Sequence, residues 1–169
     1  VTRRRERGVD LANEWNIAPG SLFVERDRQM LISGLAAADV DAVRSAVPEM
    51  WPDRPGGWVH EWSRLAAGYA EGKRHQLAAL AYGWAKFPTL ANDARRTALQ
   101  RQLEQYLLAV PGFQVAFERR VLQAPHGSGT TPVPVHLLTP PAWAGGPPVM
   151  LPVIHILRCR RSTLWSSLR

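Results

Sequence analysis

The fold is decided by one block of sequence, which reads WVHEWSRLAAGYAEG (58–72), HQLAALAYGWAKFP (75–88), RRTALQRQLEQYL (95–107), FQVAFERRVLQAP (113–125) and PVPVHLLTPP (132–141). The first three segments repeat apolar residues with the period of a helix. The last two alternate apolar and polar residues as strands do. The sequence therefore predicts an α+β chain in which a helical domain is followed by a β-hairpin.

Three helices are predicted in this block, over residues 59–71, 74–86 and 93–109. Gly72 and Pro88 are placed to end the first and the second helix. The faces of these two helices are rich in alanine, so we expect them to pack closely as an antiparallel pair.

The third predicted helix has a clear start and an apolar stripe. Asn92 is the expected N-cap, because its side chain can accept a hydrogen bond from the first turn. The stripe follows the helical period and consists of Leu99, Leu103, Tyr106 and Leu107. We expect this stripe to be the packing face of the helix.

The hairpin strands are joined by HGSGTT at residues 126–131. Alternation places Val115, Phe117 and Arg119 on one side of the first strand and Ala116, Glu118 and Arg120 on the other. In the second strand, Pro134 cannot donate to a ladder, which predicts a strand at a sheet edge.

The flanks carry weaker patterns. Before the block, Asp10 to Trp15 is predicted to open a helix that Pro19 and Gly20 break, and Leu35 to Val47 reads as a short helix that Pro48 ends. Beyond the hairpin, Val149 to Ile156 is apolar on both faces, which is typical of a strand covered on both sides.

These patterns divide the chain into four parts. They are an N-terminal segment with one or two short helices (1–57), a helical domain (58–112), the first strands of a sheet (113–156) and a patternless basic tail (157–169). The change of composition in the tail suggests a truncated or out-of-frame reading of a longer gene. Because the run 149–156 would then lack its cover, we expect exposed apolar surface and self-association.

The net charge of +7 does not favour nucleic-acid binding, because it is concentrated at the ends of the chain. Four of the positive charges, Arg158, Arg160, Arg161 and Arg169, lie in a tail without acids. No zinc-finger spacing or aromatic RNA-binding motif accompanies them. Apolar runs also fall short of the roughly 20 residues that a membrane span needs. We therefore expect a cytoplasmic protein that binds neither membrane nor nucleic acid.

The block from Trp58 to Ile156 resembles the FrsA-like branch of the α/β-hydrolases, whose members carry a helical domain ahead of the catalytic sheet. The matching text is WVHEWSRLAAGYAEG, HQLAALAYGWAKFP, RRTALQRQLEQYL, FERRVLQAP and PVPVHLLTPP. The resemblance implies the opening of a truncated α/β-hydrolase sheet. It also implies hydrolysis of ester or related carbonyl bonds, and C–C cleavage of ketones in some relatives, without a cofactor.

The sequence departs from this family where catalysis would occur. It contains no GxSxG nucleophile elbow, and no glycine follows Gly146 to form an oxyanion turn. Ser128 lies in a turn between strands, where nothing activates it. We therefore assign no catalytic residue, and we expect this N-terminal piece of a hydrolase to be inactive alone.

Aromatic residues of the helical block are candidate substrate-lining residues, because the family's helical domain covers the active-site mouth. They are Trp58, Trp62, Tyr69, Tyr82 and Trp84. Core packing is the favoured alternative for all five, since they follow helical spacing.

The histidines give no convincing site. His136 and His155 lie on successive predicted strands and could be neighbours, but no further metal ligands accompany them at suitable spacing. We therefore predict no metal site. A function of another class remains open, which is that of a helical module that binds a protein partner.

Overall fold

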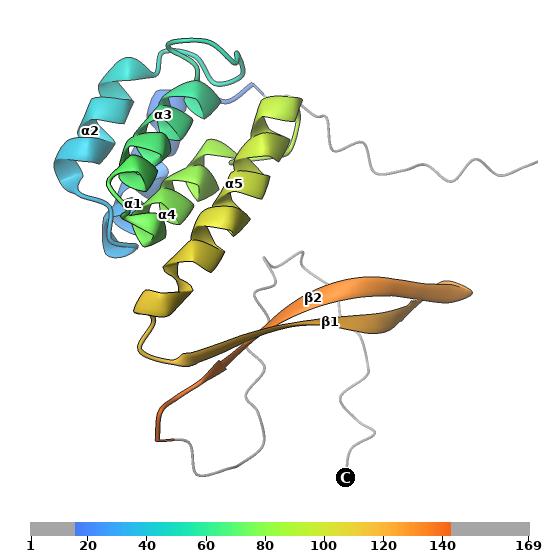
Figure 1. Ribbon diagram of the computed structural model, residues 1–169. Coiled ribbons are helices and arrows are strands. Elements are labelled where there is room, and N and C mark those ends of the chain that lie inside the picture. The colour runs from blue at the N-terminus through green and yellow to red at the C-terminus, as the bar shows by residue number, and fades with distance from the viewer. Residues whose placement is uncertain (1–15, 143–169) are drawn as a thin grey trace, which may run out of the picture.

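The computed structural model describes residues 16–142, which form five helices followed by a two-stranded antiparallel hairpin (Figure 1). The elements are α1 (Pro19–Ile32), α2 (Ala37–Ala46), α3 (Trp58–Glu71), α4 (His75–Ala85), α5 (Asp93–Ala109), the 3-10 turn η1 (Val110–Gly112), β1 (Ala116–His126) and β2 (Gly129–Thr139). The α+β prediction is confirmed. The predicted helix start at 10–15, the predicted strand at 149–156 and the tail lie outside the described residues.

The three helices of the central block begin and end within one residue of their predicted bounds, and α2 lies within the stretch predicted from Leu35 to Val47. The prediction for Pro19 was wrong, because Pro19 starts α1 instead of breaking a helix. A proline suits the first helical position, where its fixed φ is already helical and its missing N–H would have no helical partner.

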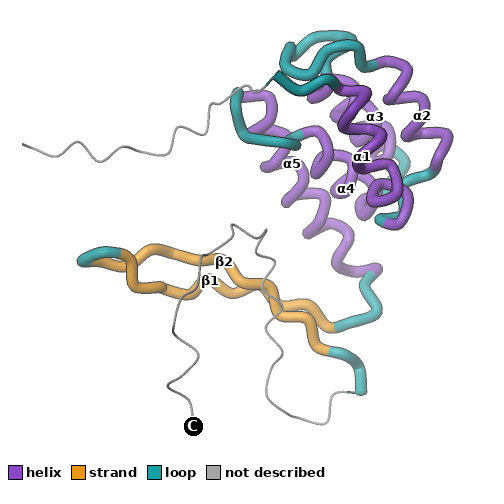
Figure 2. Tube along the Cα trace, turned by 180° about the vertical axis from the view of Figure 1, so that it is seen from behind, coloured by secondary structure: helices purple, strands orange, loops and turns teal. Residues whose placement is uncertain are grey.

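The helices gather in one bundle, and the hairpin extends away from it beyond the end of α5 (Figures 1 and 2). Helices α3 and α4 form the centre as the expected antiparallel pair. Helix α5 packs against α4, while α1 and α2 lie on the side of α3.

The centre of the bundle is a cluster of aromatic rings. Trp58 and Trp62 of α3 are fully buried, and the ring of Phe23 from α1 lies 4.9 Å from that of Trp58. Trp84 of α4 lies 6.2 Å from Trp62. The indole Nε1 of Trp58 donates a hydrogen bond of 2.7 Å to the carbonyl oxygen of Trp84. Three helices are thus joined by contacts that bury a large apolar area.

The packing face of α5 differs from the predicted one. The buried residues of this helix are Arg95 and Ala98, whereas Leu99 and Leu103 remain partly exposed. Farther along the buried face, Gln102 lies so close to Gly83 of α4 that a Cβ at Gly83 would approach its Nε2 to 3.0 Å. Helix α5 therefore approaches α4 through polar and small residues and turns Leu99 and Leu103 outward.

Arg95 of α5 is a charged residue whose side chain is fully buried, so its donors need partners inside the protein. Its guanidinium donates to the carbonyl oxygen of Phe87 and, at 2.5 Å, to that of Met50, and it lies 4.7 Å from the centre of the Trp51 ring. Its backbone N–H donates at 3.0 Å to the side chain of Asn92, which confirms the predicted N-cap. One arginine thus links α5 to the two loops that precede α3 and α5.

The hairpin pairs Ala116 with Thr139 at its base and His126 with Gly129 at its tip. Its turn therefore consists of Gly127 and Ser128, which is shorter than the predicted HGSGTT. Gly127 has a φ of +57°, as the first central residue of a type II′ turn requires. The predicted alternation agrees with the register, and Pro134 pairs with Val121 in a sheet in which both strands are edges.

Replacing Arg95 with Met should destabilise the protein by about 2 to 4 kcal/mol, because two buried carbonyl groups lose their donor. The neighbouring Arg96→Met is the matched control. Arg96 is exposed and pairs with Asp93 at the surface, so its loss should cost less than about 0.5 kcal/mol. Urea unfolding followed by circular dichroism measures both values. Equal effects of the two substitutions would contradict the role given to Arg95.

Candidate functional site

The five candidate substrate-lining residues all lie in the interior of the helical bundle. Trp58, Trp62, Tyr69 and Tyr82 are at most 3% exposed, and Trp84 is 9% exposed. They do not line either of the two surface hollows described below. Their contacts agree with the packing alternative, and a contact with substrate stays a prediction.

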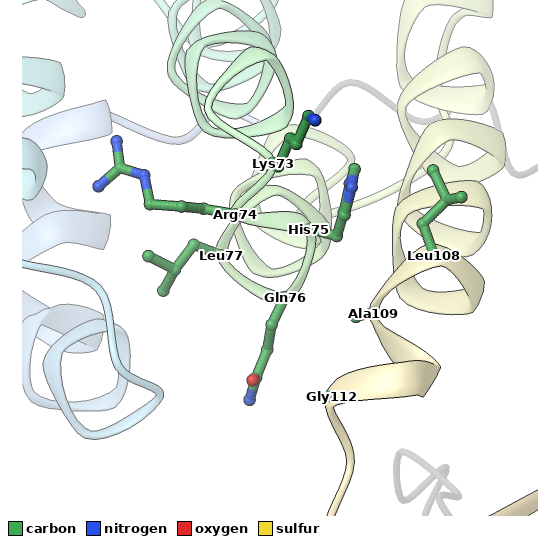
Figure 3. Close-up of a pocket in the computed structure, with 8 residues that line it drawn as sticks. All are labelled: Lys73, Arg74, His75, Gln76, Leu77, Leu108, Ala109 and Gly112. Carbon is green, nitrogen blue, oxygen red and sulfur yellow. The ribbon is translucent and has the colours of Figure 1, made fainter.

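The first hollow, of about 390 Å³, lies between the start of α4 and the end of α5 (Figure 3). Its lining consists of Lys73, Arg74, His75, Gln76, Leu77, Leu108, Ala109 and Gly112. The basic residues Lys73 and Arg74 lie in the turn between α3 and α4. The backbone of Lys73 is in the left-handed region, with a φ of +55°. No carboxylate is among the lining residues, so the hollow is positively charged.

Two of these side chains are already engaged by their neighbours. The Nδ1 of His75 lies 2.8 Å from Oε1 of Gln105 on α5, a contact that makes Nδ1 the donor. The guanidinium of Arg74 lies 4.5 Å from the centre of the Tyr69 ring and extends away from His75 and Leu108 (Figure 3). The hydroxyl of Tyr69 donates to the carboxylate of Asp39 on α2. Burial, followed by this hydrogen bond to Asp39, raises the pKa of Tyr69.

The second hollow, of about 340 Å³, lies between the loop before α3, α3 itself and the first half of α5. Its polar lining residues are Asp53, Ser63, Asp93, Thr97 and Arg101. Asp93 is fully exposed apart from its ion pair with Arg96, at 2.6 Å. The hollow thus combines exposed carboxylates and hydroxyls without a histidine that could act as their base.

The described part of the chain brings together no group of three or more His, Cys, Asp or Glu side chains that could hold a metal ion. Ser128 occupies the tip of the hairpin, where it is exposed. Acyl transfer needs a nucleophile, a base and an oxyanion site in mutual geometry. Residues 16–142 supply polar and cationic surface, but they do not assemble these three groups.

Glu61 is a buried carboxylate that sequence reasoning missed. It lies in the first turn of α3, where its Oε1 accepts a 3.0 Å hydrogen bond from the N–H of Gly56, and its Oε2 accepts one of 2.9 Å from Arg64. Burial alone would raise its pKa, but these two donors outweigh burial and hold the pKa below its ordinary value of 4.5. Glu61 thus fastens the proline- and glycine-rich loop 51–57 to α3. An acid in the first turn after a Pro-Gly loop was the available signal.

His136 lies in an aromatic cluster where the hairpin meets α5. Its ring is stacked on that of Tyr106, with centroids 5.4 Å apart and planes inclined by 10°, and lies 5.1 Å from that of Phe117. Partial burial, followed by the charge of Arg119, lowers the pKa of His136. Its predicted neighbour His155 lies outside the described residues.

No protein-family model matches this chain, and no curated protein matches it either. None of the helices in residues 16–142 has the length and apolar character to cross a membrane.

Replacing Glu61 with Gln should reduce stability at pH 7 by about 1 to 2 kcal/mol, because two hydrogen bonds lose their charged acceptor. The folded-state pKa is depressed, so this contribution is present above the ordinary value of 4.5 and is lost as the pH falls through the lower folded value. The difference between wild type and variant should therefore shrink in urea titrations from pH 7 to pH 3.

The matched control is Glu71→Gln at the exposed end of α3, which should change stability by less than about 0.5 kcal/mol. A Glu61→Gln difference that stays constant down to pH 3 would show that the lost stability does not depend on the carboxylate charge.

Proposed function

We propose that this chain is the helical domain and the opening strands of an FrsA-like α/β-hydrolase, which acts on ester or related carbonyl bonds and in some members on C–C bonds. The observation that carries the proposal is the order of a helical bundle followed by a hairpin that no other part of residues 16–142 covers. Apolar side chains remain exposed on both faces of the hairpin; they are Val121, Leu122, Val133, Leu137 and Leu138. A two-stranded sheet is marginally stable alone, so such a hairpin suits a larger sheet.

The proposed role of the chain is structural rather than catalytic. The aromatic core packs α3 against α4, and α5 leads into the hairpin through η1. The nucleophile and the oxyanion turn are then supplied by sequence that this chain does not contain, because its 169 residues include no GxSxG segment. Small-molecule esters or ketones are the substrates of the complete enzyme under this proposal.

Sequencing the gene beyond this reading is the most direct test of the assignment. The DNA beyond the codon for Ile156, read in all frames, should encode a Gly-rich turn and then a GxSxG segment between a predicted strand and a predicted helix. Finding neither in any frame would overturn the hydrolase assignment.

The purified chain should hydrolyse activated esters such as p-nitrophenyl acetate no faster than buffer, because residues 16–142 do not assemble a nucleophile with its base. Ser128→Ala is the matched variant, and it should leave the rate unchanged. Reproducible hydrolysis that disappears with this substitution would instead identify a compact hydrolase.

The alternative function is a helical interaction module, and the outer face of α1 favours it. Val24 and Ile32 on this face are 86% and 74% exposed. The partner in this alternative is a second copy of the chain. Sedimentation equilibrium should then show a dimer that the double substitution Val24→Lys and Ile32→Lys converts to monomer, whereas a wild-type monomer would exclude this alternative.

A further inference from the structure

The two edges of the hairpin differ in their capacity to add a strand. The sheet that residues 16–142 form has two strands, so the outward N–H and C=O groups of β1 and of β2 are not paired within it. A row of such groups is a template for another strand. The register shows which residues direct their backbone groups outward.

The turn of the hairpin fixes the direction of every N–H in its strands. His126 and Gly129 flank a turn of two residues, so they form a hydrogen-bonded pair, and every second pair from there is hydrogen-bonded as well. The even-numbered residues of β1 and the odd-numbered residues of β2 therefore direct their N–H groups into the hairpin, and the others direct them outward. The prolines of the two strands all fall at outward positions, where the hairpin needs no N–H; they are Pro125, Pro132 and Pro134.

These prolines interrupt the edge of β2 and leave most of the edge of β1 open. Pro132 and Pro134 occupy outward positions in the middle of β2, so this edge cannot donate along its centre. On β1, the outward positions from Phe117 to Gln123 all keep an N–H. Residues 118–123 are exposed, and the hairpin extends away from the bundle (Figures 1 and 2). The edge of β1 is therefore the one that can accept a further strand.

The charges of β1 indicate which strand fits this edge. Arg120 donates hydrogen bonds of 2.6 and 2.8 Å to the two carboxylate oxygens of Glu118, which lies two residues away on the same face of the strand. Both side chains are more than half exposed. An apolar strand would offer these charges no partner, whereas an antiparallel copy of β1 presents the same two charges in reverse order.

We propose that β1 pairs with β1 of a second copy of this chain, antiparallel and across a two-fold axis at Arg119, so that the two hairpins form a four-stranded sheet. A two-fold axis makes such an interface self-complementary, because each contact occurs twice. The inference rests on the register and the charges of the hairpin, and it does not depend on the hydrolase assignment.

A register centred on Arg119 matches the side chains of the two copies. Glu118 lies across from Arg120 of the second copy, and the symmetric pair lies on the other side of the axis, so each carboxylate has a guanidinium on both strands. Phe117 lies across from Val121 of the second copy, which pairs two apolar side chains. The outward N–H and C=O groups of the two strands exchange about six hydrogen bonds in this register.

The like-charge contact of this register is that of Arg119 with Arg119 of the second copy. It is a hydrogen-bonded pair, in which the Cα atoms are about 5.5 Å apart and the side chains are farther from each other than in the other kind of pair. Sliding one copy by two residues replaces this contact with a pair of Arg120 or of Glu118 side chains and removes both Glu–Arg pairs. The charges of β1 therefore favour the register centred on Arg119.

The substitution Val121→Pro tests the pairing without removing a hydrogen bond of the hairpin. Position 121 has an outward N–H, so the ladder with β2 keeps its donors, whereas the dimer loses two donors by symmetry. The matched control is Thr130→Pro, at an outward position of β2. One strand per chain forms a small interface, so we expect a dimer with a roughly micromolar Kd. In sedimentation velocity of the full chain, Val121→Pro should raise this Kd by about tenfold or more, and Thr130→Pro should leave it unchanged.

Reversal and restoration of charge test the register. Glu118→Arg places like charges across from each other and should raise the Kd by about tenfold or more. Combining Glu118→Arg with Arg120→Glu exchanges the two charges, so the Kd should return to within about threefold of the wild-type value. Glu104→Arg on an exposed position of α5 changes the net charge as Glu118→Arg does, and it should leave the Kd unchanged.

Spin labels measure the position of the axis directly. In a Cys159→Ser background, one nitroxide per chain is attached at Gln123→Cys or at His126→Cys, which lie four and seven residues from Arg119. With a rise of about 3.3 Å per residue, the two labels of a dimer should be about 26 and 46 Å apart. Double electron–electron resonance measures these distances, and equal distances for the two sites would overturn the proposed register.

The outcomes separate this interface from other modes of association. A wild-type chain that stays monomeric at about 100 μM overturns the proposal, and so does a dimer that Val121→Pro and Thr130→Pro weaken equally. A dimer that is dissociated by Val24→Lys with Ile32→Lys, and not by Val121→Pro, belongs to the outer face of α1 and also overturns it. Circular dichroism checks that each variant is folded. If Val121→Pro does not fold, the charge exchange decides the question.

Discussion

The buried guanidinium of Arg95 is the contact on which the second half of the structure depends. A charged group is stable in the interior only when its donors are satisfied, and the carbonyl oxygens of Met50 and Phe87 accept two of its hydrogen bonds. Both carbonyls belong to loops, that of Met50 to the loop before α3 and that of Phe87 to the loop before α5. By binding them, Arg95 fixes the two loops relative to each other and determines where the first turn of α5 lies.

The placement of α5 has consequences for everything that follows it. With Arg95 and Ala98 inward, the leucines at positions 99 and 103 must point away from the bundle. Tyr106 shares their stripe and becomes the contact for the hairpin, through Phe117 and His136. The arginine in the first turn of α5 therefore determines which face of α5 the hairpin contacts, about three turns farther along the helix.

The described residues form a helical bundle with a buried core and a hairpin whose apolar side chains are largely exposed. The helical bundle buries its aromatic residues and satisfies its buried carboxylate, Glu61, with two donors. The hairpin buries little of its own apolar surface, and both of its strands are edges. This contrast between a covered bundle core and an exposed hairpin is the observation on which the proposed function rests.

The sequence by itself determined the elements, because their signals are local. Helical periodicity, the Asn92 cap and strand alternation predicted α3, α4, α5 and the hairpin within narrow limits. Only the tertiary structure decided which face α5 buries. The leucine stripe of α5 is the stronger apolar signal in sequence, yet a buried arginine and small or polar residues form the packing face. The arginine can be buried because the backbone carbonyls of Met50 and Phe87 accept its hydrogen bonds. The same holds for Glu61, whose burial depends on a donor from a loop that local patterns cannot place.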